Sequence, residues 1–388
     1  MNDIDEKASL CALGRIFGFE PKTALALISH YGDAKSIFRL GKDELEALLG
    51  PYSRHRGEIC PEKQEEAYRE LTDLMSKGIR YIGFTEENYP EMLKECEDAP
   101  VGLYIRSETA EDELWTPSRK IAVVGTRDIS PYGKEWCERI IRGMTGSGEK
   151  PMIVSGLALG TDICAHRTAL DCGLPTIGVM ATGPECIYPY RNESTAREMS
   201  RTPGCALVTD YPPGTAPLAV HFLRRNRIIA GLSQSTILVE SKIRGGGMMT
   251  ARLAFSYNRD VYALPGRADD IRSQGCNRLI KEKIAEPLTS ITELLDSIGM
   301  KSSTKSGKLS AADILTNIYS DTMDHDKIRM MHKILEKIIG ERGISIEEIA
   351  DSAGIPYHMA GKFCNIMESD NLISIDLLGR CSIRAKNF

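Results

Sequence analysis

A repeated alternation of short apolar runs with glycine turns and helical stretches is the feature that most constrains the fold of this chain. From residue 120 onward the runs occur in KIAVVG, PMIVSG, LPTIGV, CALVTD, STILVE and RDVYAL. Short strands that are apolar throughout and are each followed by a helix are typical of a parallel sheet with helices on both faces. The pattern predicts an α/β fold with a Rossmann-like, doubly wound, mostly parallel sheet.

The remaining sequence divides around this domain. Residues 1–75 show apolar positions at helical spacing, broken by glycines and a proline, and predict a small helical domain of the SAM or helix-hairpin-helix type. Residues 76–298 form the extended Rossmann-like domain. Residues 299–310, GMKSSTKSGKLS, have the composition of a flexible linker. In residues 311–388 the order of three helices and a hairpin predicts a winged helix.

The charge of the chain is unevenly distributed, although its formal net value is only −5. Residues 1–117 carry −10, residues 118–290 carry +7 and residues 310–388 carry −3. A basic centre between acidic flanks favours an anionic partner for the central domain, the alternative being a chance surface bias. Because the predicted winged helix is acidic, docking to a partner or to a second copy is favoured there over DNA binding.

Cysteine usage and hydropathy set the cellular context that we expect. The eleven cysteines are scattered, with no C-x-x-C motif and no zinc-finger spacing, so we expect reduced thiols and neither disulfides nor a metal. No apolar run has the length of a membrane span, and MNDIDEKASL lacks the features of a signal peptide. The sequence predicts a cytoplasmic protein without a membrane partner.

The segment FLRRNR carries the strongest local signal. Arg224, Arg225 and Arg227 surround Asn226 immediately before an apolar run, and guanidinium groups match the geometry of phosphate oxygens. At least one of the three arginines is expected to bind the C-termini of neighbouring strands instead. Phe222 is a candidate for stacking on a base, with a place in the core as the alternative.

Glycine-rich turns follow three of the predicted strands and could bring backbone N–H groups to an anion. The alternatives are tight packing between strand and helix, or a simple loop. A carboxylate that precedes the third turn, Glu240, is expected to hold one of the arginines. The candidate phosphate-binding positions in the turns and the helix behind them are Gly125, Thr126, Arg127, Ser155, Gly156, Gly246, Gly247 and Thr250.

Taken together, these motifs resemble the DNA-processing protein A family, also called DprA or Smf. The resemblance rests on GTR, SGLALGTDICAH, ATGPECIYP, FLRRNRIIAGLS and RDVYALPG with SQGCNRLI, in the family's order and spacing. It covers about residues 118–287 and extends upstream through ENYPEMLKECEDAP. It implies single-stranded DNA binding, protection of incoming DNA and loading of the RecA recombinase in natural transformation (competence) or recombination.

The resemblance also implies roles for individual positions. Arg127, Ser155 and Gly156, together with three positions of FLRRNR (Arg224, Asn226 and Arg227), match the family's phosphate-binding pocket. The family's dimer surface corresponds to Leu279, Ile280 and Ile284. This chain departs from the family at Thr126, at the triple glycine, and at Lys283-Ile284, where the family has Gly-Ala after the helix.

Two other classes of function are weighed against this one. A Rossmann-like nucleotide hydrolase that releases a base from a nucleoside monophosphate would place a carboxylate on the helix after the glycines, but MMTARLAF has none. Neither a Walker A motif nor a G-x-G-x-x-G fingerprint is present. A scaffold that stores a mononucleotide is the second alternative. We therefore expect a DNA-binding homodimer with no catalytic residues and no cofactor.

Overall fold

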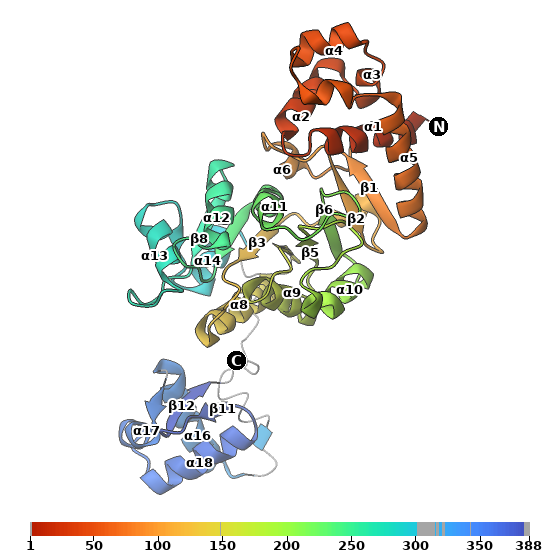
Figure 1. Cartoon of the computed structure of the whole chain (residues 1–388). Helices are drawn as coiled ribbons and strands as arrows, with labels where there is room; N and C mark the ends of the chain where they lie inside the picture. The colour runs from red at the N-terminus through yellow and green to blue at the C-terminus, as the bar shows by residue number, and fades with distance from the viewer. Residues whose placement is uncertain are drawn as a thin grey trace. The chain divides into compact units, whose positions relative to one another are not determined.

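The structure, a computed structural model, describes residues 2–147, 149–300, 315, 318–319, 323–341 and 343–383. The chain forms two compact units, Met1–Ser302 and Ser303–Phe388 (Figure 1). Most of the predicted linker, residues 301–310, lies outside the described residues.

A nine-stranded sheet forms the centre of the first unit, in the order β1-β2-β6-β5-β4-β3-β7-β8-β9. Strands β3 to β9 run parallel, whereas β1 and β2 pair antiparallel with each other and β2 pairs antiparallel with β6. The mostly parallel α/β sheet predicted from the sequence is confirmed. The strands are β1 Ile79–Gly83, β2 Gly102–Arg106, β3 Lys120–Val124, β4 Met152–Ser155, β5 Thr176–Val179, β6 Ala206–Thr209, β7 Ser235–Leu238, β8 Asp260–Ala263 and β9 Glu286–Pro287.

Helices cover both faces of this sheet, as Figure 1 shows. They are α6 Glu91–Lys94, α7 Glu111–Leu114, α8 Pro131–Gly143, α9 Thr161–Asp171, α10 Glu193–Arg201, α11 Ala219–Gly231, α12 Gly246–Ser256, α13 Gln274–Lys281 and α14 Ile291–Ser297.

Alternate residues of the strands enter different hydrophobic cores. In β3, Ile121 and Val123 pack with α8 and α9, whereas Ala122 and Val124 pack with α11 and α12. All four side chains are buried because both faces of the sheet are covered. This is the physical reason that the strands are apolar throughout in sequence.

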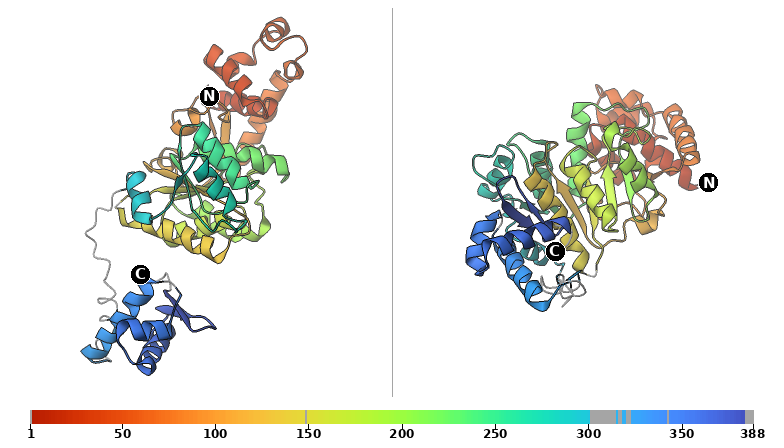
Figure 2. Two further views of the ribbon diagram at one scale, coloured as in Figure 1. Left: turned by 90° about the vertical axis from the view of Figure 1, so that its left-hand side faces the viewer. Right: turned by 90° about the horizontal axis from the view of Figure 1, so that it is seen from below.

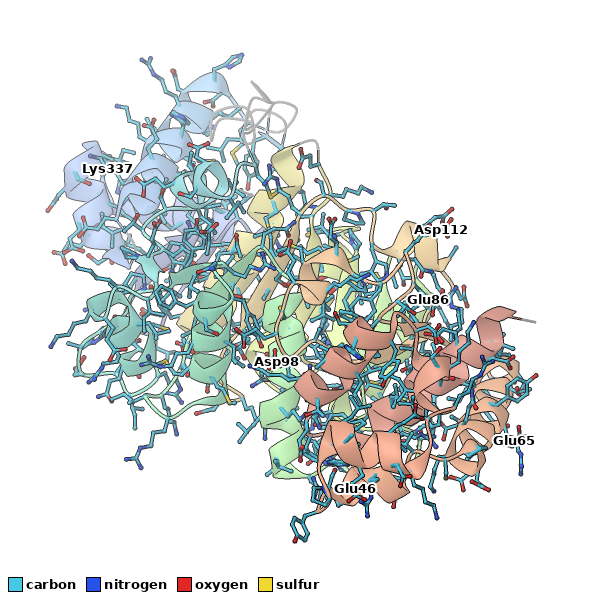
Figure 3. The ribbon with its side chains drawn as sticks, turned by 90° about the horizontal axis from the view of Figure 1, so that it is seen from above. Glu46, Glu65, Glu86, Asp98, Asp112 and Lys337 are labelled. Carbon is cyan, nitrogen blue, oxygen red and sulfur yellow. The ribbon has the colours of Figure 1, made fainter. Side chains whose placement is uncertain are left out.

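The N-terminal helices form a layer against the antiparallel edge of the sheet (Figure 2). They are α1 Asn2–Ile16, α2 Pro21–Tyr31, α3 Ala34–Ile37, α4 Lys42–Leu49 and α5 Pro61–Ser76. Their core includes Tyr81 of β1 and Tyr104 of β2, so the helices pack on the sheet directly. Acidic side chains such as Glu46 and Glu65 lie exposed on this layer (Figure 3).

The second unit contains α16 His325–Gly340, β10 Ile344–Ser345, α17 Ile346–Ala353, α18 Tyr357–Ser369, β11 Ile373–Ile375 and β12 Arg380–Ile383. The three strands form an antiparallel sheet in the order β10-β12-β11. From α16 onward, the described residues follow the order of three helices and a hairpin expected from the sequence, and the assignment of this part as a winged helix stays a prediction. Over the described part of the chain, none of the helices combines the length and the apolar character that crossing a membrane requires.

Candidate functional site

The order of the strands reverses at β3, which lies between β4 and β7. In open α/β sheets the loops at the carboxyl ends of the strands separate at such a point and leave a crevice for a ligand. A cavity of about 650 Å³ opens here, lined by the loop after β3, the glycine loop after β7 and one face of α11. We call it the switch-point cavity.

The loop after β3 is held by close packing. A side chain at Gly125 would lie 2.9 Å from the carbonyl oxygen of Glu240, so this position needs glycine. The carbonyl of Thr126 accepts hydrogen bonds from the backbone N–H and the hydroxyl of Thr161, at 3.1 and 3.2 Å. These contacts fix the backbone directly before Arg127, which lines the cavity with an exposed side chain.

Arg127 belongs to an aromatic cluster at the cavity wall. Its guanidinium lies 5.3 Å from the centre of the Phe222 ring, and that ring lies 5.6 Å from the ring of Tyr188. Phe222 is half-buried and Tyr188 is 46% exposed, so neither ring is in the core. Arg127 makes no hydrogen bond or ion pair with any residue that the structure describes. The cavity therefore presents a cation with free donors beside aromatic surface.

The glycine loop after β7 adds the start of a helix. Helix α12 begins at Gly246, and Gly246 and Gly247 both line the cavity. First-turn N–H groups have no partner within their own helix, and the helix dipole favours an anion beside them. Thr250 also lines the cavity, but it is buried, and its hydroxyl lies 3.5 Å from the carbonyl of Gly246.

The arginines of FLRRNR do not converge on one pocket. Arg225 and Asn226 line the switch-point cavity, whereas Arg224 and Arg227 line a second cavity of about 510 Å³ on the other side of α11. The prediction of a single pocket is wrong because successive residues of a helix turn by about 100°. Arg225 and Asn226 lie three and four positions after Phe222 and share its face, and Arg224 and Arg227 point roughly the opposite way.

Arg225 holds the ends of two strands. It is 3% exposed and donates to the carbonyl of Gly156, at 2.6 Å, and to that of Val179. Burial lowers its pKa to about 10, although the nearby carboxyl of Asp162 opposes the shift. Gly156 follows β4 and Val179 ends β5, so the expectation that one arginine binds the C-termini of neighbouring strands is confirmed.

Arg227 has a structural role as well. Its side chain is 6% exposed, and its guanidinium forms an ion pair with the buried carboxylate of Asp210 and donates to the carbonyl of Asp98. Among the residues that the structure describes, Glu240 binds no arginine: its carboxylate accepts from the backbone N–H of Ser130 at 2.9 Å and from the Ser130 hydroxyl at 2.5 Å, at the start of α8. The expectation for Glu240 is wrong.

Two further predicted phosphate contacts lie behind the cavity rather than on its surface. The hydroxyl of Ser155 is fully buried and donates to the carbonyl of Val123 at 2.6 Å. A side chain at Gly156 would lie 2.6 Å from the guanidinium carbon of Arg225. Ser155 and Gly156 thus allow close packing of β3, β4 and α11, and neither lines the cavity.

The predicted dimer surface is partly internal. Leu279 is completely buried in the core beneath α13, so the assignment of its side chain to the surface is wrong. Ile280 and Ile284 are partly buried and pack against that core. Helix α13 ends at Lys281, and Lys283 turns the chain with a positive φ of 57°.

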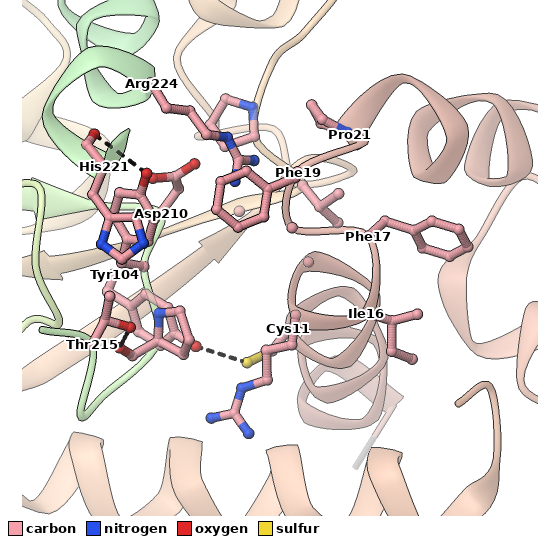
Figure 4. Close-up of a pocket in the computed structure, with 18 of the residues that line it drawn as sticks. Cys11, Ile16, Phe17, Phe19, Pro21, Tyr104, Asp210, Thr215, His221 and Arg224 are labelled. Atoms are coloured by element: carbon pink, nitrogen blue, oxygen red, sulfur yellow. Dashed lines mark hydrogen bonds between the residues drawn. The ribbon is translucent and has the colours of Figure 1, made fainter. Parts of the chain in front are cut away.

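Sequence reasoning missed the second cavity and its aromatic side chains. Phe19, Tyr211 and His221 line it together with Arg224 (Figure 4). Asp210 comes directly after the apolar run CALVT, and a carboxylate at a strand end was a signal that could have been used. The described residues contain no group of three or more His, Cys, Asp or Glu side chains arranged to hold a metal ion.

Comparisons with known proteins agree with this architecture. The family model of DNA recombination-mediator protein A matches residues 80–299, more than half of the chain. DNA processing protein DprA of Streptococcus pneumoniae is 37% identical over 61% of this chain and 82% of its own length. Protein Smf of Escherichia coli is 39% identical over 50% of each chain.

Two solved structures have the same fold over most of their length. The X-ray structure of DNA processing protein A from S. pneumoniae superposes with a TM-score of 0.61 at 32% identity, over 75% of this chain and 97% of that one. A structure of DNA processing protein A from Helicobacter pylori, which describes the single-stranded DNA binding mode of that protein, gives a TM-score of 0.50 at 30% identity, over 56% and 95%. The fold and the cavity define the class of this protein: it has a Rossmann-like domain with an arginine-lined cavity at the switch point of its sheet. The chain belongs to the DNA recombination-mediator protein A family.

Proposed function

We propose that this protein binds single-stranded DNA by placing its phosphate backbone in the switch-point cavity. The observation that carries the proposal is Arg127: its exposed guanidinium has no partner among the described residues, lies on the ring of Phe222 and shares the cavity with the first turn of α12. A guanidinium and helix N–H groups both bind phosphate oxygens well.

The aromatic side chains favour single strands over duplex DNA. Phe222 and Tyr188 at the cavity wall offer ring surface on which a base can stack, and a base can reach such a surface only when it is unpaired. The H. pylori relative, for which a single-stranded DNA binding mode has been described, supports the same choice. Phosphate contacts carry no sequence information, so we expect binding to tolerate any sequence.

We place this activity in the cytoplasm, where the bound strand is protected and passed to the RecA recombinase during transformation or other recombination. Loading of RecA can be measured as its DNA-dependent ATP hydrolysis on a strand covered by single-strand binding protein. We expect the protein to shorten the lag of that reaction. An unchanged lag at saturating protein would refute the RecA step and leave DNA binding intact.

The proposed role is non-enzymatic. Asp162 is the buried carboxyl group that lines the cavity, and burial raises its pKa. It accepts a hydrogen bond from the N–H of Ala158, and α12 carries no carboxylate to act on a nucleotide. Incubation with nucleoside monophosphates should release no free base; release of base would favour the hydrolase alternative.

The decisive experiment is the replacement Arg127→Ala, with Arg139→Ala as matched control. Arg139 also stacks on an aromatic ring, that of Trp136 at 4.6 Å, but it lies on α8 outside the cavity. Fluorescence anisotropy with labelled oligonucleotides should show about tenfold weaker binding for Arg127→Ala with unrelated sequences. The slope of log K against log salt should fall by roughly 0.7 for the lost contact. Equal binding by the two variants would refute the proposal.

We also propose a homodimer, now with Ile280 and Ile284 as its apolar contacts, since Leu279 is internal. Light scattering should give the mass of a dimer for the wild-type protein and that of a monomer for Ile280→Asp. An unchanged mass would place the contact elsewhere.

A further inference from the structure

The second cavity contains a binding arrangement of its own, which we call the Phe19 cavity. It lies between the N-terminal helical layer and α11 and has a volume of about 510 Å³. Phe19 enters from the N-terminal layer, and Arg224, His221 and Asp210 come from the elements that face it (Figure 4). None of these side chains lines the switch-point cavity.

The guanidinium of Arg224 lies over two aromatic rings. It lies 4.5 Å from the centre of the Phe19 ring and 6.0 Å from that of Tyr211. Stacking occupies the faces of the planar guanidinium and leaves the N–H donors at its edge free to bind two oxygens of a phosphate group. Over the ranges that the structure describes, no hydrogen bond or ion pair satisfies those donors.

The other arginines of the Phe19 cavity are neutralised by partners. Arg15 pairs with Glu70, Arg54 with Glu20, and Arg227 with Asp210. Among the four arginines that line the cavity, Arg224 is thus the one without an ion-pair or hydrogen-bond partner in the described residues.

Phe19 supplies the second half of the arrangement. Its side chain is 59% exposed although it stands at a cavity, and the His221 ring lies 6.2 Å away. An exposed aromatic ring beside an unpaired guanidinium offers a nucleotide both a stacking surface for its base and donors for its phosphate.

Helix α11 and the loop before it form a common wall between the two cavities. Tyr211, Pro212 and Thr215 of this loop line the Phe19 cavity, whereas Pro217 and Ala219 line the switch-point cavity. A strand in the switch-point cavity therefore has to cross only one helix, about 10–12 Å wide with its side chains, to reach Arg224.

We propose that the Phe19 cavity binds a further nucleotide of the single strand held in the switch-point cavity, with its base on Phe19 and its phosphate on Arg224. The inference rests on the proposed function and extends it: the N-terminal helical layer becomes part of the DNA track. Long oligonucleotides engage both cavities, and short ones fill only the switch-point cavity.

The test is a length series of oligothymidylates of roughly 4 to 16 nucleotides, measured by anisotropy with the full-length protein. Phe19→Ala and Arg224→Gln should each weaken binding of the longest oligonucleotide about tenfold and change binding of the shortest bound one less than twofold. Arg127→Ala should weaken binding at every length. Because Phe19 is exposed, its replacement should leave the fold intact, which thermal unfolding checks.

Two control variants match the replaced side chains. Tyr52 is an aromatic residue of the same helical layer, 98% exposed and away from the cavity, so Tyr52→Ala should bind every length like wild type. Arg69→Gln, on the exposed face of α5, controls for the loss of a positive charge.

Each outcome decides the matter. Wild-type binding of long oligonucleotides by Phe19→Ala and Arg224→Gln, with Arg127→Ala impaired, overturns the Phe19 site and leaves the proposed function standing. Failure of the wild-type protein to bind any length overturns both. If thymidine monophosphate competes and the two replacements weaken only its binding, the cavity is a site for a free nucleotide, and the continuous DNA track is wrong.

Discussion

Replacing Arg227 by alanine distinguishes a phosphate ligand from a structural tie. The family resemblance places this residue in the phosphate pocket. In the structure, however, its guanidinium forms an ion pair with Asp210 and donates a hydrogen bond to the carbonyl of Asp98. The second oxygen of Asp210 is buried and has no hydrogen-bond partner in the structure. Removing the guanidinium therefore leaves a buried carboxylate without its ion-pair partner.

The expected cost follows from burial. The Arg227 and Asp210 side chains are only 6% and 7% exposed, and breaking a buried ion pair by removing one partner costs about 3–5 kcal/mol. The exposed pair Arg69–Glu65, with side chains 73% and 57% exposed, should contribute only about 0.3–0.5 kcal/mol. A loss of 3–5 kcal/mol is a large part of the total stability of about 5–15 kcal/mol that is usual for a domain.

Urea unfolding measures this difference for Arg227→Ala, with Arg69→Ala as control. Adding Asp210→Asn should recover part of the loss, because a neutral amide is less costly to bury without a cation. Below the unfolding temperature, Arg227→Ala should bind single-stranded DNA with a salt slope equal to that of wild type. An unchanged unfolding midpoint together with a reduced salt slope would show that Arg227 contacts phosphate and that the structural explanation is wrong.

Three further predictions concern stability and domain roles. Burial, and secondarily Arg225, lowers the pKa of His166 to about 3 in the folded state, against about 6.5 when unfolded. The stability that comes from keeping His166 neutral is therefore complete above about pH 6.5 and decreases as the pH falls toward 3. Between pH 7 and 5 the free energy of unfolding of the wild type, measured in urea, should fall by about 2 kcal/mol more than that of His166→Gln. The control His30→Gln, at an exposed site, should show the same pH dependence as the wild type. Leu279→Asp should lower the thermal midpoint or abolish folding, because it buries a charge in the core, and a folded monomer would contradict this. Deleting residues 303–388, a unit with its own core whose residues 310–388 carry a net charge of −3, should change single-stranded DNA affinity less than twofold, whereas a tenfold loss would make that unit a DNA-binding element.

The sequence by itself determined the architecture of the central domain. Strands β3 to β8 are largely buried on both faces, so their apolar runs are visible without knowing what packs on them. The closeness of the two switch-point loops could also be predicted from the sequence. Parallel strands end at the same edge of the sheet, so Arg127 and Gly246 lie near each other however the helices pack. The family resemblance rests on these local motifs.

Only the tertiary structure decided what each arginine of FLRRNR does. The partners of Arg225 and Arg227 include the backbone carbonyls of Gly156, Val179 and Asp98. Every residue type has a backbone carbonyl, so the sequence does not indicate which of them accepts a hydrogen bond from an arginine. Which of these acceptors an arginine reaches depends on the rotation of α11 about its axis. Burial of a helix face is likewise set by its neighbours, and this is why Leu279 was expected at the surface and lies in the core.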